Sequence, residues 1–445
     1  MRTIGSLLLV LIFLTTSVIA NDIAVTIYNQ NLGLVRDTRA VQIHKGAFSL
    51  EFSDVAAQID PTSVHLKLDG ATLLDQDFEY DLVSRERLLE KYLDQDVQIF
   101  TDQGEMFEGK LLSASGSVMI LQSPDGQVQA VSPDAVRDVR FGELPGGLRT
   151  RPTLVWSLIG QKAGKKDAEI SYLTGGLNWH AEYVAVINDK DETLELSSWV
   201  SIDNRSGTTY ENAKLKLMAG DVQVLGPRGR GPVAFSPSVV NEAQDAKGFE
   251  EKAFFEYHLY TLQRPTTLKD RQTKQISLFD PAVVDAEREY VFEARRNATK
   301  VNVKVIFKNE EKAGLGLPLP AGKVRVYQAD SDGGMEFIGE DFVDHTPKDE
   351  EVQLTVGSAF DIVAEKKTVE VKRISDRIRE ESYQIDIRNH KEEAVTVKVV
   401  EAVWGDWQML ESSFEYNKKD ANTIEFNIPV AAGKENILTY RVRRQ

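Results

Sequence analysis

The stretch VNVKVIFK at Val301–Lys308 decides the fold class of this chain. Its apolar side chains occupy every second position, at Val301, Val303, Val305 and Phe307, while Asn302, Lys304 and Lys308 mostly take the other face. Successive side chains of a β-strand point to opposite faces of its sheet. The stretch therefore predicts a strand with one face in a core and the other in water.

The same alternation recurs along the chain. It is found at Phe48–Phe52, Val64–Leu68, Leu194–Leu196, Tyr383–Ile387, Val395–Val399 and Ile424–Ile428. Gly, Pro, Asn and Asp separate these segments, as at residues 330–334 and 432–433. We expect a mainly β, multi-domain protein built from antiparallel, immunoglobulin-like β-sandwiches.

Residues 84–142 form a block with a different pattern. Ser84 can cap a short helix, and five short strands follow it, at Val97–Thr101, Met106–Ser113, Ser117–Gln122, Gln127–Val131 and Asp138–Phe141. Gly109 would bend the second strand, and a one-turn connection joins the last two. This order resembles an inserted small barrel of the Sm-like or SH3 type, and the alternative is a pair of plain hairpins. Its many acidic residues argue against RNA, so we interpret it as an interaction or spacing module.

We divide the rest of the chain by composition and pattern. The expected regions are a signal peptide at 1–20, an N-terminal β region at 21–83, a central β-sandwich region at 143–295 and a C-terminal immunoglobulin-like sandwich at 296–445. A Gly- and Pro-rich polar tract at 225–251 interrupts the central region and predicts a mobile loop, or equally a lid.

The N-terminus has the pattern of an export signal. Arg2 precedes an apolar run at Leu7–Leu14, and small residues lead to Ala20. We expect cleavage after Ala20 and a periplasmic or secreted chain without a transmembrane segment. An uncleaved anchor helix is the alternative, but the apolar run is shorter than the roughly 20 residues that span a bilayer.

Composition narrows the classes of function. The 445 residues include no cysteine, which excludes disulfides, a lipid-modified cysteine anchor and thiol catalysis. Asp and Glu number 69 against 53 Lys and Arg, for a net charge of -16. Such a surface repels polyanions, so we expect no nucleic acid partner.

Several runs of sequence resemble one family. They are VTIYNQNLGLVRD at 25–37, DPTSVHLK at 60–67, LTGGLNWHAEYV at 173–184, NRSGTTYENAKLKLMAGDV at 204–222 and EYHLYTLQRPTTLKDRQTKQISL at 256–278. Together they resemble bacterial exported proteins grouped as domain of unknown function 4139, with distant relatives described as mucoidy-inhibitor-like. The resemblance implies a β-rich exported protein and hints at exopolysaccharide or envelope physiology. It supplies no catalytic residue.

The sequence contains no motif that carries catalysis or binds a cofactor. It has no zinc-protease spacing, nucleophile elbow or phosphate loop. Glu256 and His258 could provide two metal ligands, but zinc needs at least three. The acidic turn at 330–333 lacks the downstream glutamate of a calcium loop and suits a hairpin. We therefore predict no catalytic residue, metal or cofactor.

The candidate binding residues are those of the matching runs that a sandwich core does not obviously need. They are Trp179, His180, Tyr210, Glu211, Glu256, Tyr257, His258, Tyr260, Arg264 and Pro265. Aromatic rings beside polar side chains suit a carbohydrate or a peptide. The competing interpretation, which we favour, is that these aromatics fill the core and anchor the modules.

The resulting hypothesis is a non-enzymatic, exported binding or scaffold protein of the cell envelope. Exposed strand edges and loops between modules would engage an envelope protein or a glycan. The alternatives are a hydrolase that acts on envelope polysaccharide or peptide through a carboxylate pair, and a structural surface module that binds itself.

Overall fold

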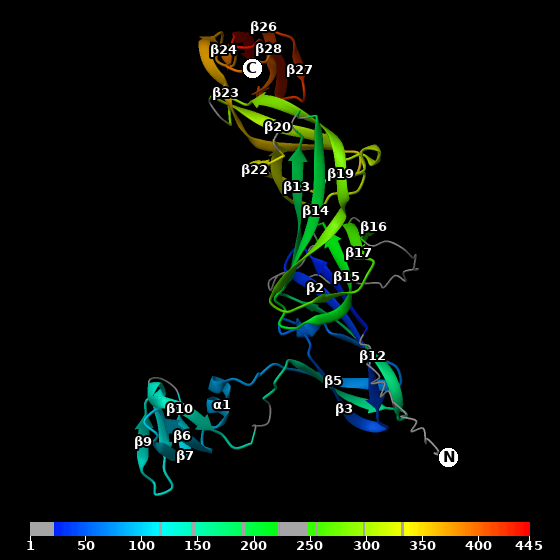
Figure 1. Ribbon diagram of the computed structural model, residues 1–445, viewed down its shortest axis with the longest axis vertical. Coiled ribbons are helices and arrows are strands. Elements are labelled where there is room, and N and C mark those ends of the chain that lie inside the picture. Colours follow the sequence, from blue (N-terminus) through cyan, green and yellow to red (C-terminus); the bar gives the residue numbers. More distant parts are fainter. Residues whose placement is uncertain are drawn as a thin grey trace, which may run out of the picture.

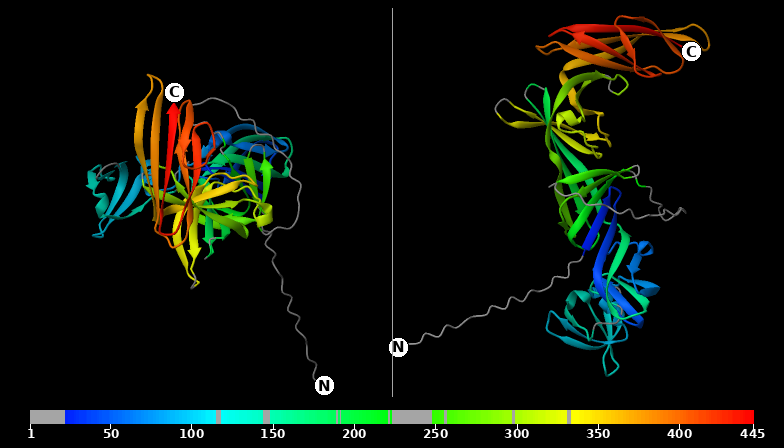
Figure 2. Two further views of the ribbon diagram at one scale, coloured as in Figure 1. Left: turned by 90° about the horizontal axis from the view of Figure 1, so that it is seen from above. Right: turned by 90° about the vertical axis from the view of Figure 1, so that its right-hand side faces the viewer.

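A computed structural model describes residues 22–114, 118–143, 148–188, 190, 192–220, 222, 248–254, 257–296, 299–330 and 333–445. The molecule is elongated, with residues 85–140 near one end and the last strands at the other (Figures 1 and 2). The predicted signal peptide lies outside the described residues, as does most of the predicted loop at 225–251. The last residues of that predicted loop belong to a strand that begins at Phe249.

The first body contains two sheets. Its eight-stranded sheet has the order β16-β17-β15-β1-β2-β12-β4, with β18 paired to β15. These strands are β1 (Asp22–Tyr28), β2 (Leu32–Ile43), β4 (His65–Leu68), β12 (Gly164–Thr174), β15 (Tyr210–Ala219), β16 (Phe249–Phe254), β17 (Tyr257–Leu262) and β18 (Thr266–Leu268). The second sheet has the order β3-β11-β5, with β3 (Gly46–Ser53), β5 (Ala71–Glu79) and β11 (Thr153–Gly160). A 3-10 turn at Pro61–Ser63 precedes β4.

A thirteen-stranded sheet forms the rest of the main body. Its main path is β22-β21-β13-β14-β19-β20-β23-β24-β29-β26, and β25, β27 and β28 branch from β19. The strands are β13 (Leu177–Ile187), β14 (Thr193–Asn204), β19 (Gln272–Phe292), β20 (Lys300–Lys308), β21 (Gly322–Ala329), β22 (Met335–Val343), β23 (Glu351–Arg373), β24 (Arg379–Asn389), β25 (Val395–Ala402), β26 (Trp407–Ser412), β27 (Tyr416–Lys418), β28 (Thr423–Val430) and β29 (Glu435–Arg444). A further 3-10 turn is at Glu311–Ala313.

The mainly β prediction is confirmed, and the opening stretch is strand β20, with Val301, Val305 and Phe307 buried. The pairings between described strands are antiparallel except β1–β15, β13–β21 and β19–β25, which are parallel. The predicted turn at 330–333 joins β21 to β22, where the Gly333 amide donates to the Asp330 carbonyl.

Two large cores hold the main body. One core runs from Val25 to Leu354, so the N-terminal and central regions share it. The other runs from Tyr290 to Val442. Strands β19, β20 and β23 each supply side chains to both cores. Alternation shows which residues point inward, but not which core receives them.

Residues 85–140 form a module with a core of its own. It contains α1 (Arg85–Lys91), β6 (Asp96–Thr101), β7 (Met106–Ser113), β8 (Met119–Gln122), β9 (Val128–Val131), a 3-10 turn (Pro133–Ala135) and β10 (Val136–Arg140). The Ser84 hydroxyl caps α1 by accepting from the Arg87 amide. The antiparallel sheet has the order β10-β6-β7-β8-β9, and its described pairings do not join β9 to β10. The module is inserted between β5 and β11, which pair with each other.

Candidate binding face

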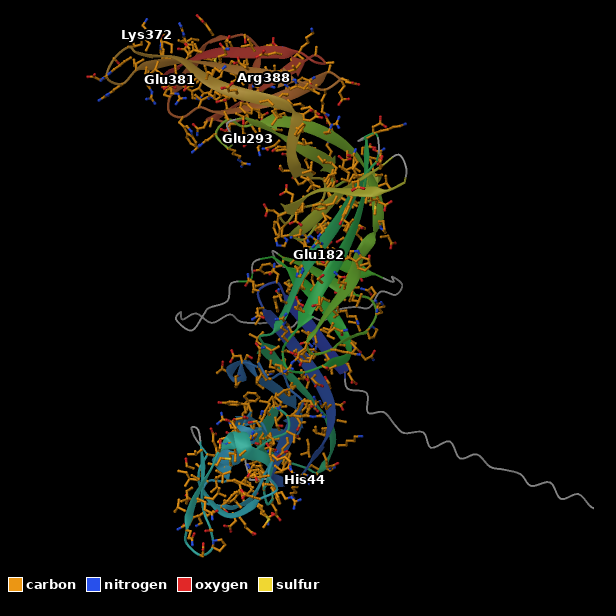
Figure 3. All side chains as sticks on the ribbon, turned by 60° about the vertical axis from the view of Figure 1, so that its left-hand side comes forward. His44, Glu182, Glu293, Lys372, Glu381 and Arg388 are labelled. Carbon is orange, nitrogen blue, oxygen red and sulfur yellow. The ribbon has the colours of Figure 1, made fainter. Side chains whose placement is uncertain are left out.

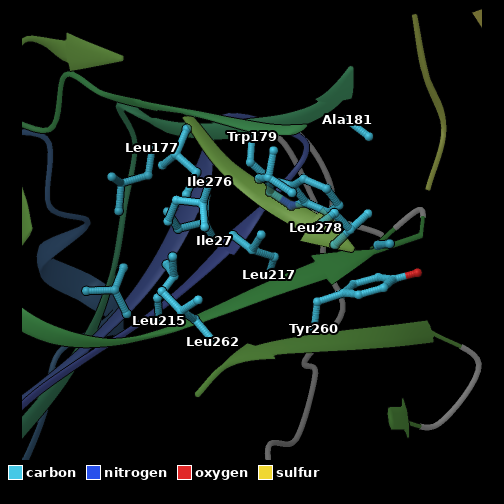
Figure 4. Close-up of a cluster of buried hydrophobic side chains, with 14 of the residues drawn as sticks. Ile27, Leu177, Trp179, Ala181, Leu215, Leu217, Tyr260, Leu262, Ile276 and Leu278 are labelled. Atoms are coloured by element: carbon cyan, nitrogen blue, oxygen red, sulfur yellow. The ribbon is translucent and has the colours of Figure 1, made fainter. Parts of the chain in front are cut away.

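Three of the predicted aromatic residues are part of the core. Trp179, Tyr210 and Tyr260 are 2–3% exposed. Trp179 and Tyr260 lie among aliphatic side chains of the largest core (Figure 4). Each ring has one polar contact: Trp179 Nε1 donates to the Met218 carbonyl, Tyr210 to Ser206 Oγ and Tyr260 to the Pro318 carbonyl. Their rings face the core and are not presented to a ligand.

The remaining predicted residues do not converge on one site. His258 Nδ1 is 2.6 Å from Glu251 Oε1 of the neighbouring strand β16. Tyr257 is half-buried, whereas Glu211, Arg264 and Pro265 are exposed. Glu256 lies outside the described residues. No group of three or more His, Asp or Glu side chains in the described part of the chain could hold a metal ion.

His180 belongs to a polar cluster on the outer face of β13. The alternation of β13 turns Ala181 and Tyr183 into the core, and His180 and Glu182 away from it. Figure 3 shows Glu182 midway along the molecule.

Glu182 is the centre of this cluster. Its Oε2 accepts from Ser201 Oγ at 2.8 Å and from Gln275 Nε2 at 2.9 Å. Its Oε1 lies 3.8 Å from His180 Nε2 and 3.7 Å from Arg325 Nη1. Four strands, β13, β14, β19 and β21, thus place one carboxylate among four polar partners.

These contacts keep Glu182 ionised. The hydrogen bond from Ser201 is the main cause that holds the pKa of Glu182 below its usual value, and the electrostatic interactions with His180 and Arg325 act in the same direction. Partial burial opposes them and is outweighed. Glu182 is therefore a hydrogen-bond acceptor with a fixed orientation.

Sequence reasoning missed every outer-face residue except His180, and the most exposed ring beside this carboxylate is Trp199. It pairs with Glu182 across β13 and β14, and it is 43% exposed. The signal was present in the sequence. Leu194, Leu196, Val200 and Ile202 of β14 point inward, so the same alternation places Trp199 on the outer face.

The cross-strand row of Glu182 continues to an exposed edge. Lys323 of β21 pairs with Glu182, and Phe342 of β22 pairs with Lys323. Phe342 is 61% exposed. The row thus has an exposed ring at each end and charged groups between them. We call Trp199, Glu182, His180, Arg325, Lys323 and Phe342 the outer face.

This arrangement suits a ligand with both apolar faces and hydroxyl groups. A tryptophan ring offers a large, rigid apolar surface. The carboxylate accepts hydrogen bonds beside it, while the guanidinium and ammonium groups donate them. Sugars present these two kinds of surface together.

The fold and the outer face define a mainly β protein of several sheets with an inserted five-stranded module. The family model of the domain of unknown function DUF4139 matches residues 168–444, more than half of the chain, and the chain belongs to this family. The match includes the outer face and the C-terminal core, and it confirms the resemblance seen in the sequence. No curated protein gives a significant match. In the described part of the chain, no helix has the length and apolarity to cross a membrane.

Proposed function

We propose that this chain is an exported, non-enzymatic binding protein that holds an envelope glycan on its outer face. The observation that supports this proposal is the exposed ring of Trp199 directly opposite the ionised, fully oriented carboxylate of Glu182. Water contact is unfavourable for an apolar ring, so covering the ring of Trp199 with the apolar face of a sugar lowers the free energy.

The outer face is a better docking site than the backbone edge of strand β22, where a partner strand could otherwise be added. Asp341 Oδ2 of β22 accepts from the Thr355 amide of β23 at 2.6 Å. A Cβ on Gly339 would lie 2.1 Å from the Val356 carbonyl oxygen, so the two backbones are in close contact. These contacts with β23 cover the middle of this edge, and we assign the binding to the exposed side chains of the outer face.

Hydrolysis through a carboxylate pair is the less favoured alternative, because Glu182, the carboxylate of the outer face, has a lowered pKa. A glycosidase needs one carboxyl group with a raised pKa to protonate the leaving group. Among the described residues, every shifted Asp or Glu has a lowered pKa, namely Glu86, Asp125, Glu182, Glu311, Glu380, Asp386 and Asp420. These groups are suited to accepting hydrogen bonds, not to delivering a proton.

The location is part of the proposal and rests on the N-terminal sequence. Arg2, the apolar run and Ala20 support export with cleavage after Ala20. N-terminal sequencing of the chain recovered from the periplasm and medium should begin at Asn21. A full-length chain in the cytosol would contradict export.

The finer architecture is also proposed. The two strand groups β23-β24-β29-β26 and β25-β28-β27 share one core and support an immunoglobulin-like C-terminal sandwich. The helix, five strands and 3-10 turn of the insert support a small barrel of the Sm or SH3 type. Its position on a stalk between β5 and β11 supports a role as a spacer.

The glycan proposal is tested by binding of the purified chain to exopolysaccharide and peptidoglycan from the bacterium that produces it. We expect Trp199→Ala to weaken binding by about tenfold, since stacking on one ring contributes about 1 kcal/mol or more. Glu182→Gln should weaken it by a similar factor. Trp404→Ala is the matched control, because Trp404 is 53% exposed in the C-terminal body. Equal binding by the Trp199→Ala and Trp404→Ala variants would contradict the proposal.

A further inference from the structure

A second candidate site lies at the seam between the two large cores. It is a cavity of about 290 Å³ that is lined by strands β13, β19, β20, β21, β22 and β23 and the turn after β24. Its apolar walls include Ile187, Val303, Ile338 and Val356. Ligand sites occur preferentially at such junctions, and this volume is at the small end of their range.

Strand β23 has a large bulge at this cavity. Ser358 pairs with Asn302 and Val363 with Lys300, so residues 359–362 face Val301 alone. The bulge presents Phe360 at the lip of the cavity with 95% of its surface exposed. Bulges re-aim side chains and are frequent next to binding sites. The ring of Phe360 packs into neither core, so it is available to cover an apolar group bound in the cavity.

Two cations that line the same cavity converge on one carboxylate oxygen. Arg288 Nη2 lies 3.2 Å and Lys391 Nζ 3.3 Å from the same oxygen, Glu393 Oε1. Both cations also lie 5.4 Å from the centre of the Tyr290 ring. Arg288, Tyr290 and Lys391 all line the cavity. The geometry therefore shows how these two cations hold one carboxylate.

The Glu393 carboxylate that occupies this position is easily displaced. Its side chain is 57% exposed. Ion pairs at such exposure contribute little stability, commonly 0 to about 1 kcal/mol. Asp361 also lines the cavity, and its negative charge disfavours a ligand with several negative charges.

We propose that this cavity binds an apolar acid with a single carboxylate. The carboxylate takes the place of Glu393 between Arg288 and Lys391, the apolar group fills the cavity, and Phe360 covers it. A peptide with an apolar C-terminal residue and a free small acid share this chemistry. The proposal is independent of the glycan proposal, because none of the outer-face residues lines the cavity.

The test is calorimetric titration of the purified chain with two pairs of probes. One pair is N-acetyl-L-leucine and N-acetyl-L-leucinamide, and the other is acetyl-Gly-Gly-Leu with a free and an amidated C-terminus. We expect each acid to bind at least about tenfold more tightly than its amide, as is typical of a charge-assisted hydrogen bond. Binding of the tripeptide acid alone would identify a chain terminus as the occupant. If neither acid binds, or if acids and amides bind equally, the proposal is wrong.

Variants give a second test, because some should weaken binding of the acid and one should strengthen it. Arg288→Gln should weaken the acid about tenfold, and Phe360→Ala should weaken it several-fold. Glu393→Gln should strengthen it, because it removes the competing carboxylate. Val371→Ala is the control, since Val371 is a 60% exposed apolar residue of the same strand. Weaker binding by the Glu393→Gln variant would contradict the displacement of Glu393.

Discussion

Two tryptophans, Trp179 and Trp199, show how the phase of a strand decides the role of a residue. Trp179 is 2% exposed and Trp199 is 43% exposed, although they lie on adjacent strands. Trp179→Ala should lower the free energy of unfolding by about 3–5 kcal/mol, because it leaves a cavity in the largest core. Trp199→Ala should change it by about 0.5 kcal/mol or less. Urea denaturation of both variants measures the difference, and similar losses would show that Trp199 is also a packing residue.

Glu182 should make stability depend on pH in acid. Its pKa is lowered in the folded chain, so its contribution is present above the pKa of the unfolded chain, near 4.5, and is lost as the pH falls through the folded pKa. Melting temperatures measured from pH 7 to pH 3 should therefore fall less steeply for Glu182→Gln than for the unaltered chain. Parallel curves would show that the Ser201 and Gln275 hydrogen bonds do not favour the ionised form.

The C-terminal core contains an ion pair whose carboxylate is buried. Lys366 Nζ donates to Glu401 Oε2, and the Glu401 side chain is only 4% exposed. Lys366→Met leaves this carboxylate buried without its cation and should lower the free energy of unfolding by about 3–5 kcal/mol. The double variant with Glu401→Leu should recover most of that loss, because it removes the unpaired charge. A double variant no more stable than Lys366→Met would assign the loss to packing.

For individual residues, the sequence predicted which side chains point inward better than it predicted which ones are available to a ligand. Trp179, Tyr210 and Tyr260 attracted attention by residue type, but the alternation of Leu177, Trp179, Ala181 and Tyr183 in β13 places Trp179 in the core. The same alternation assigned to β14 would have identified Trp199. The partners of Glu182 were beyond prediction, since Ser201, Gln275 and Arg325 meet it only through the order of the strands.

Individual strands join the two large cores, and this should make them unfold together. Strand β19 has 21 residues and β23 has 23, and each packs first in one core and then in the other. Leu354→Ala affects the first core and Ile387→Ala the second. Calorimetry should show that each substitution lowers the midpoint temperature of the same main unfolding transition. If Ile387→Ala separates a second transition from it, the shared strands do not couple the cores.

The strands themselves were predictable, whereas their neighbours were not. The alternating segment at 300–308 is a strand at nearly the predicted bounds. Strand β21 was expected within the C-terminal sandwich, yet it pairs in parallel with β13 and contributes Val324 and Val326 to the first core. Alternation depends on the two faces of a strand, while pairing depends on backbone groups that every residue type except proline provides.

Over the whole molecule, the outer face, the seam cavity and the inserted module occupy different positions along an elongated chain. The two proposed sites are both in the main body, and the insert lies apart from it (Figure 1). The insert has its own core, which includes Ile99, Leu111 and Leu121. A module with a separate core on a stalk can be removed without exposing the cores of the body.

The stalk is well defined where it leaves the body. Glu79 of β5 pairs with Thr153 of β11, and beyond them the Val83 amide donates to the Arg149 carbonyl. Arg149 also pairs with Glu51 and Glu79. These contacts end the main body just before Ser84, so replacing residues 84–148 by a flexible linker of about eight residues retains them.

The shortened chain should unfold in the same main transition as the full chain and should bind the same ligands. We expect its melting temperature to stay within a few degrees of that of the full chain, because the buried residues of both large cores are retained. Glycan and acid binding should also be unchanged if the insert acts as a spacer. A main transition lowered by ten degrees or more would show that the insert stabilises the body. A normal transition with weaker glycan binding would show instead that the insert contacts the ligand, and would replace the spacer role by a direct one.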